Sequence, residues 1–158
     1  MIYIGIGSNL GNRIENITKA KYFLDLNGIN ITKSSSYYET LSWPDPNKPK
    51  FINIVVQSNT KASPEKLLKI FKSIEKKLGR KKKSKNSPRT CDIDIISYNK
   101  KILTGNITIP HKRMHRRNFV LIPLFELNKN WFHPKTNENI KKLIFSLSIK
   151  DIRSIKQI

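Results

Sequence analysis

The sequence predicts an α+β fold, a ferredoxin-like βαββαβ sandwich in which two helices cover one face of a mostly antiparallel sheet. Extra strands and helices are expected towards the C-terminal end. Four segments carry the apolar pattern of strands, and two others carry apolar residues at helical spacing behind capping residues. The 158 residues fit a single domain, which we expect to span residues 1–158.

The chain begins with a strand and a helix. Isoleucines alternate with tyrosine or glycine over residues 2–7, which predicts the first strand. Asn12 with Glu15 three residues later resembles a capping box, so we expect a helix that starts there and stops at the Asn-Gly pair, residues 27–28. A second strand is predicted over residues 29–39.

A proline-rich loop and a two-faced strand come next. Residues 41–50 contain three prolines and cannot form regular structure, and long loops in compact domains are often functional. In the strand predicted over residues 51–59, Ile52 lies on the face expected in the core, whereas Phe51 and Asn53 lie on the other. That pair offers a ring and an amide to a flat heterocycle, or it is an ordinary edge aromatic.

The second half of the sandwich has a helix and a further strand. Ser63 followed by Pro64 predicts the helix start, and Gly79 predicts its end. A basic loop over residues 80–87 leads into a strand at residues 91–98. Short extended pieces, an apolar segment and a final amphipathic helix are expected at residues 101–103, 107–109, 119–127 and 137–147.

The chain is strongly basic, with 31 Lys and Arg against 11 Asp and Glu and a net charge of +20. Lysine outnumbers arginine 24 to 7, and isoleucine and asparagine are also abundant. The AT-rich codons of a biased genome therefore explain this surface better than nucleic-acid binding, and a smaller anionic ligand stays open as an alternative. Arginine suits bidentate phosphate contact, and five of the seven fall in one stretch: Arg80, Arg89, Arg113, Arg116 and Arg117.

The sequence also indicates where the protein works. No stretch approaches the ~18 apolar residues that a membrane helix needs, and the N-terminus lacks the charged lead of a signal peptide. The single Cys91 excludes an intramolecular disulfide framework and a multi-Cys zinc site. We expect a cytoplasmic, globular monomer.

Asp92 and Asp94 form the sharpest local feature. Positions two apart on a strand share a face, so both carboxylates project together while Cys91, Ile93 and Ile95 face the core. Paired carboxylates suit Mg²⁺, which completes its shell with water and phosphate oxygens. Several cations precede the pair, and this layout is expected for phosphoryl-group transfer. The alternative is a solvated strand end paired with lysines.

Other features are weaker. Gly5, Gly7 and Gly11 miss the dinucleotide-binding spacing by one residue, and we interpret them as backbone accommodation at a strand-to-helix turn. His111 could donate to a phosphate that Arg117 also reaches, or it is simply packed or solvated. The chain has neither a P-loop motif nor a hydrolase triad.

Several motifs occur in order and together resemble one family. They are Ile6-Gly7-Ser8-Asn9-Leu10-Gly11, Tyr38-Glu39-Thr40, Phe51-Ile52-Asn53, Ile74-Glu75 through Gly79-Arg80, Pro88-Arg89-Thr90-Cys91-Asp92-Ile93-Asp94, and Ile109-Pro110-His111 through Arg117-Asn118-Phe119-Val120-Leu121. The set resembles the 6-hydroxymethyl-7,8-dihydropterin pyrophosphokinases of folate biosynthesis over essentially the whole chain. The resemblance implies Mg²⁺-dependent transfer of the β,γ-diphosphate of ATP, the co-substrate, to the pterin hydroxymethyl oxygen, with release of AMP.

The resemblance also implies roles for individual residues. Asp92 and Asp94 would hold two Mg²⁺ ions. Phe51 and Phe119 would sandwich the pterin, and Asn53 would hydrogen-bond its edge. The implied pocket is completed by Thr40, Leu41 and Trp43. The implied catalytic residues are Arg80, Lys82 and Arg89, and the implied ATP-binding residues are Lys72, Arg89, Thr108, His111, Lys112 and Arg117.

The loop before Pro88 departs from the family pattern. Asn86-Ser87 replaces the usual Trp-Gly, the loop is one residue shorter, and Lys82 and Lys85 stand where Arg is usual. Lysine keeps the charge but loses the bidentate geometry of arginine. Since this loop is expected to close over the substrates, we expect weaker closure and a lower rate.

Two rival functions share parts of this pattern. An RNA-recognition domain has the same βαββαβ order, but residues 51–56 lack its aromatic-rich signature. A metal-dependent nuclease would use the same acids without explaining Phe51, Asn53 and Phe119. Neither nucleic acid nor a membrane is an expected partner.

Overall fold

An antiparallel sheet lies at the centre of the chain, which the computed structural model describes over residues 1–43, 45–81 and 86–158. Its strands run in the order β5-β1-β4-β3-β6, and β2 also pairs with β4. The elements are β1 (Ile2–Ser8), α1 (Arg13–Leu26), β2 (Asn30–Ser34), β3 (Tyr38–Thr40), β4 (Phe51–Asn59), α2 (Pro64–Lys77), β5 (Asp92–Tyr98), the 3₁₀ turn η1 (Met114–Arg116), α3 (Asn118–Leu127), α4 (Ile140–Phe145), α5 (Ile149–Arg153) and β6 (Lys156–Gln157). The predicted mixed fold with an antiparallel sheet is confirmed.

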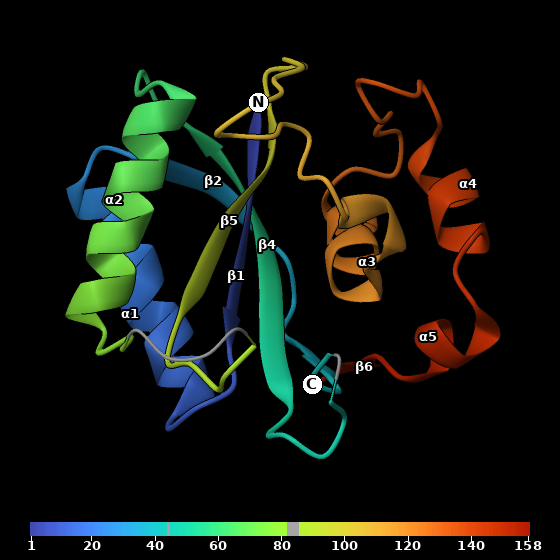
Figure 1. Cartoon of the computed structure of the whole chain (residues 1–158). Coiled ribbons are helices and arrows are strands. Elements are labelled where there is room, and N and C mark those ends of the chain that lie inside the picture. The colour runs from blue at the N-terminus through green and yellow to red at the C-terminus, as the bar shows by residue number, and fades with distance from the viewer. Residues whose placement is uncertain (44, 82–85) are drawn as a thin grey trace.

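The sheet separates two layers of helices (Figure 1). α1 and α2 lie against one face, as predicted, and α3 to α5 lie on the other side. The isoleucines of β1 and Phe71 of α2 belong to the buried cluster of the first layer. Val55, Ile96 and Leu121 belong to a second buried cluster beneath α3. Burial of both faces fixes the strand register, because a slip by one residue would exchange the two sets of side chains.

The second predicted strand, residues 29–39, is interrupted. β2 and β3 pair with different parts of β4, and the break falls at serines. The hydroxyl of Ser35 accepts from the Val55 N–H at 3.0 Å, and the Ser36 N–H donates to the carboxylate of Glu126 at 3.1 Å. The Ser35 hydroxyl and the Glu126 carboxylate thus take the place of strand partners here, where one strand ends and the chain bends into the next.

The C-terminal region differs most from the prediction. The apolar segment 119–127 is a helix, α3, although Pro123 lies inside it. Pro123 is buried, so packing against the sheet outweighs the lost backbone hydrogen bond. The predicted helix 137–147 shortens to α4, which Asn139 caps, and the extended pieces at 101–109 reduce to one bridge between Leu103 and Ile109.

The predicted helix starts are correct. Asn12 accepts from the Glu15 N–H at 3.2 Å, and Ser63 accepts from the Lys66 N–H at 3.3 Å. α1 ends at Leu26, directly before the predicted Asn-Gly stop. These caps fix where the β1–α1 and β4–α2 connections end and the two helices begin.

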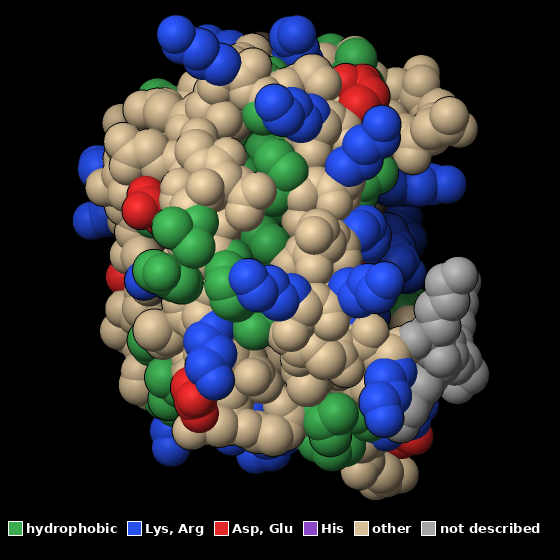
Figure 2. All heavy atoms as spheres, turned by 90° about the vertical axis from the view of Figure 1, so that its left-hand side faces the viewer, with side chains coloured by type: hydrophobic (Ala, Val, Ile, Leu, Met, Phe, Trp, Pro, Cys, Tyr) green, Lys and Arg blue, Asp and Glu red, His purple; other side chains and the backbone are tan. Residues whose placement is uncertain are grey.

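Basic side chains are spread over the surface formed by α1 and α2. Figure 2 shows this face, with Lys and Arg side chains separated by hydrophobic and uncharged ones. Such a distribution agrees with a compositional origin of the charge. Within the described residues, no helix is both long enough and apolar enough to cross a membrane.

Cys91 should not react with thiol reagents in the folded protein. It is fully buried on the core side of the sheet, and burial raises the pKa of its thiol to about 12. Because the thiolate is the reactive form, we expect Ellman's reagent to modify it only after unfolding in urea. Stoichiometric modification of native protein within minutes would show that this edge of the core opens readily.

Candidate active site

A row of side chains crosses the sheet face that lies away from α1 and α2. β5 places Asp92 opposite Gly7 of β1, and β4 places Asn53 on the other side of Gly7. Asp94 lies opposite Gly5 in the same way. The predicted same-face arrangement of the two aspartates follows from this register, since paired residues of antiparallel strands share a face.

Gly5 and Gly7 have a different role from the one predicted. Both lie inside β1, not at the strand-to-helix turn, where Gly11 alone has a positive φ of 69°. A Cβ atom at Gly7 would lie 2.6 Å from Oδ1 of Asn53. The missing side chain therefore leaves the space that the Asn53 amide occupies beside Asp92.

Gly7→Ala should displace Asn53 and destabilise the protein by about 1–3 kcal/mol, because the added methyl overpacks a buried polar site. Urea unfolding measures this loss, and pterin binding should weaken with it. Gly5→Ala is the matched control, since its Cβ would lie 3.2 Å from the Cδ1 atom of Ile96, the mobile end of a side chain. Equal effects of both substitutions would contradict the assignment of this space to Asn53.

Arg80 and Arg89 converge on Asp92. An Arg80 nitrogen lies 2.6 Å from Oδ1 of Asp92 and 2.6 Å from Oε1 of Glu75, and an Arg89 nitrogen lies 3.5 Å from the same Asp92 oxygen. Burial on its own lowers the pKa of Arg80, but the carboxylates of Asp92 and Glu75 raise it above its ordinary value. Arg80 is therefore a fixed cation at the end of β5.

Glu75 is a site residue that the sequence reasoning missed. It is only 2% exposed, and its carboxylate accepts from the Ile93 N–H at 2.9 Å and from Nζ of Lys72 at 2.9 Å, besides its contact with Arg80. One buried acid thus connects α2, β5 and the arginine. The available signal was a glutamate next to the apolar stripe of α2 in a chain with 11 acids.

Asp94 lies near an arginine and a histidine. An Arg117 nitrogen lies 3.7 Å from its Oδ2, and Nε2 of His111 lies 3.9 Å from it. Nδ1 of His111 accepts from the Arg113 N–H at 3.2 Å, and its Nε2 lies 3.4 Å from an Arg117 nitrogen, so both ring nitrogens of the neutral form face N–H donors. Burial lowers the pKa of His111, more than Asp94 raises it, which favours that neutral form.

Each aromatic residue implied for the pterin pocket has a neighbouring arginine. The Cζ atoms lie 5.3–5.6 Å from the ring centroids, in the pairs Arg89–Phe51, Arg113–Trp43 and Arg117–Phe119. These distances suit cation–π contacts. Next to Phe51, the amide of Asn53 donates to the hydroxyl of Thr40 at 3.0 Å, and both residues are buried. The ring-binding and phosphate-binding candidates therefore share one site.

Asn9 is a second residue that the sequence reasoning left without a role. Its buried amide donates to the Pro49 carbonyl at 3.1 Å and to the Ser42 hydroxyl at 3.2 Å, and its Oδ1 accepts from the Arg89 N–H at 2.7 Å. It thereby fastens both ends of the 41–50 loop to the segment that precedes β5. This connection joins loops that are far apart in the sequence, so no local pattern indicates it.

Three implied residues lie apart from these contacts. Leu41, Thr108 and Lys112 are exposed, and their side chains form no hydrogen bond or ion pair within the described part of the chain. Lys82 lies outside the described residues, as does Lys85.

The two aspartates fit a metal that is completed by other ligands. In residues 1–43, 45–81 and 86–158, no group of three or more His, Cys, Asp and Glu side chains could hold a metal ion. A pair of carboxylates on one strand, one of them 40% exposed, suits Mg²⁺ that takes its remaining ligands from water and phosphate. These two carboxylates therefore do not form a closed structural metal site.

Comparisons with known proteins identify the family. Residues 3–129 match the family model of 7,8-dihydro-6-hydroxymethylpterin-pyrophosphokinase. A 2-amino-4-hydroxy-6-hydroxymethyldihydropteridine pyrophosphokinase of Aquifex aeolicus is 37% identical over 142 residues, which cover 89% of this chain and 88% of that protein. The folic acid synthesis protein fol1 of Pneumocystis carinii is 37% identical over 155 residues, 98% of this chain.

Several relatives are much longer than this chain, which spans only 21% of the Pneumocystis protein. A crystal structure of a Plasmodium falciparum HPPK-DHPS triple mutant superposes with a TM-score of 0.75 at 14% identity, covering 99% of this chain and 46% of that one. That likeness concerns the fold alone. The family match and the Aquifex relative show that the chain belongs to the 7,8-dihydro-6-hydroxymethylpterin-pyrophosphokinase family.

Proposed function

We propose that this chain transfers the β,γ-diphosphate of ATP to the hydroxymethyl group of 6-hydroxymethyl-7,8-dihydropterin, giving AMP and the pterin diphosphate in folate biosynthesis. The observation that carries the proposal is the row Asp92–Gly7–Asn53, which sets a carboxylate with two arginines beside an amide and an aromatic ring. A diphosphate donor and a flat heterocycle would meet along this row. Family membership supports the same reaction.

In the proposed reaction, the hydroxymethyl oxygen forms a bond to the β-phosphorus while the bond from that phosphorus to the α,β-bridging oxygen breaks, and AMP leaves. The residues of the chain would act by position and charge. Arg80 and Arg89 would stabilise negative charge on the transferring group, and Arg117 and His111 would bind phosphate oxygens beside Asp94. The hydroxyl proton would pass to solvent or to product phosphate, since no side chain is assigned as its base.

Asp92 and Asp94 are proposed to hold Mg²⁺, with two ions expected. When bound, the ions would neutralise the phosphate oxygens and fix their orientation. Phe51 and Phe119 would stack on the pterin, Asn53 would bind its edge, and Thr40 would fix the Asn53 amide. Leu41, Trp43, Lys72, Thr108 and Lys112 keep the pocket and nucleotide roles that the family resemblance implies.

The finer description of the protein belongs to the same proposal. We propose a single, monomeric, cytoplasmic pyrophosphokinase domain over residues 1–158, with a ferredoxin-like core formed by β5, β1, β4, the split second strand and helices α1 and α2. An RNA-recognition function loses support because α3 packs on the face of β4 that would have to be open to bases.

Nucleotide analysis tests the proposal. The protein is incubated with ATP, Mg²⁺ and 6-hydroxymethyl-7,8-dihydropterin, and the nucleotides are separated by anion-exchange chromatography. We expect one AMP for each pterin diphosphate, no product without pterin, and none with EDTA. ADP as the product would mean ordinary kinase chemistry, and degradation of added nucleic acid would favour a nuclease.

A further inference from the structure

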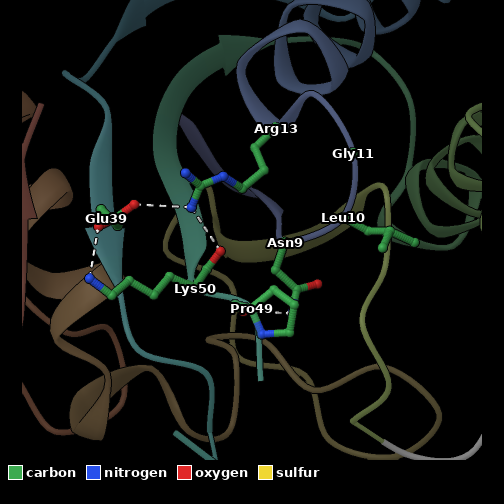
Figure 3. A pocket seen from close by; sticks show the side chains of 7 residues that line it. All are labelled: Asn9, Leu10, Gly11, Arg13, Glu39, Pro49 and Lys50. Atoms are coloured by element: carbon green, nitrogen blue, oxygen red, sulfur yellow. Dashed lines mark hydrogen bonds and ion pairs between the residues drawn. The ribbon is translucent and has the colours of Figure 1, made fainter. Parts of the chain in front are cut away.

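Arg13 connects three segments next to the proposed pterin pocket (Figure 3). One nitrogen of its guanidinium lies 3.0 Å from Oε2 of Glu39 in β3 and donates to the backbone carbonyl of Lys50 at 2.9 Å. Nζ of Lys50 lies 3.2 Å from the other carboxylate oxygen of Glu39. The start of α1, the middle of β3 and the end of the 41–50 loop are thus held by one side chain.

The helix itself does not favour an arginine at this place. Arg13 is the first residue of α1, where the helix dipole disfavours a cation. Glu39 offsets that cost. Partial burial on its own raises the pKa of Glu39, but the hydrogen bonds from Arg13 and Lys50 bring it below its ordinary value, so the carboxylate is ionised near neutral pH.

The position of the Lys50 carbonyl matters for the site because β4 begins with the next residue, Phe51. Phe51 pairs with Thr40 across β3 and β4, and Thr40 follows Glu39 directly. Arg13 therefore binds Lys50 and Glu39, the residues that directly precede Phe51 and Thr40. The neighbouring carbonyl, that of Pro49, is held by Asn9 and by the Ser42 hydroxyl, which donates at 2.6 Å.

The surroundings of Arg13 offer no substitute for it. Asn9, Leu10, Gly11, Glu39, Pro49 and Lys50 line an open cleft of about 420 Å³ together with Arg13. The arginine spans this cleft instead of packing into the core. If it were removed, water would fill the space and the loop end would lose a directional, charge-assisted restraint.

We propose that Arg13 is a positioning residue for the pterin pocket: through the Lys50 carbonyl and Glu39 it fixes where β4 begins, and so where Phe51 and Asn53 present their ring and amide. This inference rests on the proposed pterin substrate. It assigns no chemical step to Arg13, whose effect falls on the binding of the heterocycle and not on that of the nucleotide.

Substrate binding by Arg13→Ala tests the proposal, with pterin and a non-hydrolysable ATP analogue titrated separately by calorimetry. We expect the Kd for pterin to rise about tenfold, as for a lost hydrogen bond to a charged group, and the Kd for the analogue to change less than about twofold. Arg13→Lys should recover part of the pterin affinity. Equal weakening of both ligands, or no weakening of pterin, would overturn the proposal.

Two control variants separate this role from general stability. Lys50→Ala removes the exposed ammonium but keeps the carbonyl, so we expect the Kd for pterin to rise less than about threefold. Lys19→Ala removes an exposed ion pair with Glu15 on the same helix and should leave pterin binding unchanged. An effect of Lys50→Ala as large as that of Arg13→Ala would place the role in the charge of Glu39 and not in the carbonyl.

Backbone amide exchange separates failure of this inference from failure of the proposed function. Arg13→Ala should accelerate exchange over residues 50–53 relative to Lys19→Ala, with or without ligand. If the parent protein bound no pterin but this acceleration occurred, the restraint would be correct and the proposed substrate wrong. If pterin bound and exchange did not change, the positioning role would be wrong.

Discussion

Asp94→Ala should reduce AMP formation by about a thousandfold and leave the folding free energy nearly unchanged. The carboxylate is 40% exposed, and its neighbours Arg117 and His111 are 3.7 and 3.9 Å away, too far for strong hydrogen bonds. Its removal therefore costs the fold little. It would, however, leave a bound metal without one of its two protein ligands.

The measurement is kcat for AMP release at saturating substrates, alongside urea unfolding of the same samples. Asp25→Ala, at an exposed position of α1, is the control and should retain full activity. Asp94→Asn should be nearly as inactive as the alanine variant, because an amide lacks the charge that Mg²⁺ requires. An Asp94→Ala protein with activity within about tenfold of the parent would remove Asp94 from the metal site.

Glu75→Ala should destabilise the protein by about 3 kcal/mol, the largest loss that we expect from any single polar residue. Its carboxylate is buried, and its removal leaves the Ile93 N–H without an acceptor and Arg80 without one of its two carboxylate partners. Arg80 would then be free to leave Asp92. We therefore expect activity to fall together with stability.

Urea unfolding and kcat for AMP formation measure both effects. Glu75→Gln should cost less, because its amide oxygen can still accept from the Ile93 N–H. Glu15→Ala, which loses only an exposed pair with Lys19, should cost less than about 1 kcal/mol. A Glu75→Ala protein as stable as Glu15→Ala would mean that water replaces the carboxylate and that the buried network contributes little.

The candidate site could be predicted wherever it depends on local periodicity. Asp92 and Asp94 share a face because any strand alternates with period two, and Cys91 is buried for the same reason. The helix starts at Asn12 and Ser63 could be predicted because capping depends on residues within one turn.

The remaining features depend on which distant segments meet. The role predicted for Gly7 was wrong because its lack of a side chain makes room for Asn53 of β4. No residue close to Gly7 in the sequence indicates that these two positions pair. Glu75 acts on β5 from α2, and Glu126 bends the chain at Ser36 from α3. No regular structure is predicted for the apolar segment 119–127, and its helix contains Pro123, which tertiary burial accommodates.

The alternation along β5 also affects how the protein can change over generations. Ile93 and Ile95 contribute to the buried core, whereas Asp92 and Asp94 would contribute to the proposed chemistry, although all four lie in one short segment. Over residues 92–95, variation at the odd positions is then limited by folding and variation at the even positions by turnover, whereas the later even positions Ile96 and Tyr98 are buried as well. A saturation mutagenesis library of these four positions, sorted separately for abundance and for activity, would give two tolerance profiles one residue out of phase. Because the two sets of residues are separate, substitutions at Asp92 and Asp94 can change the chemistry of the site without lowering the free energy of unfolding.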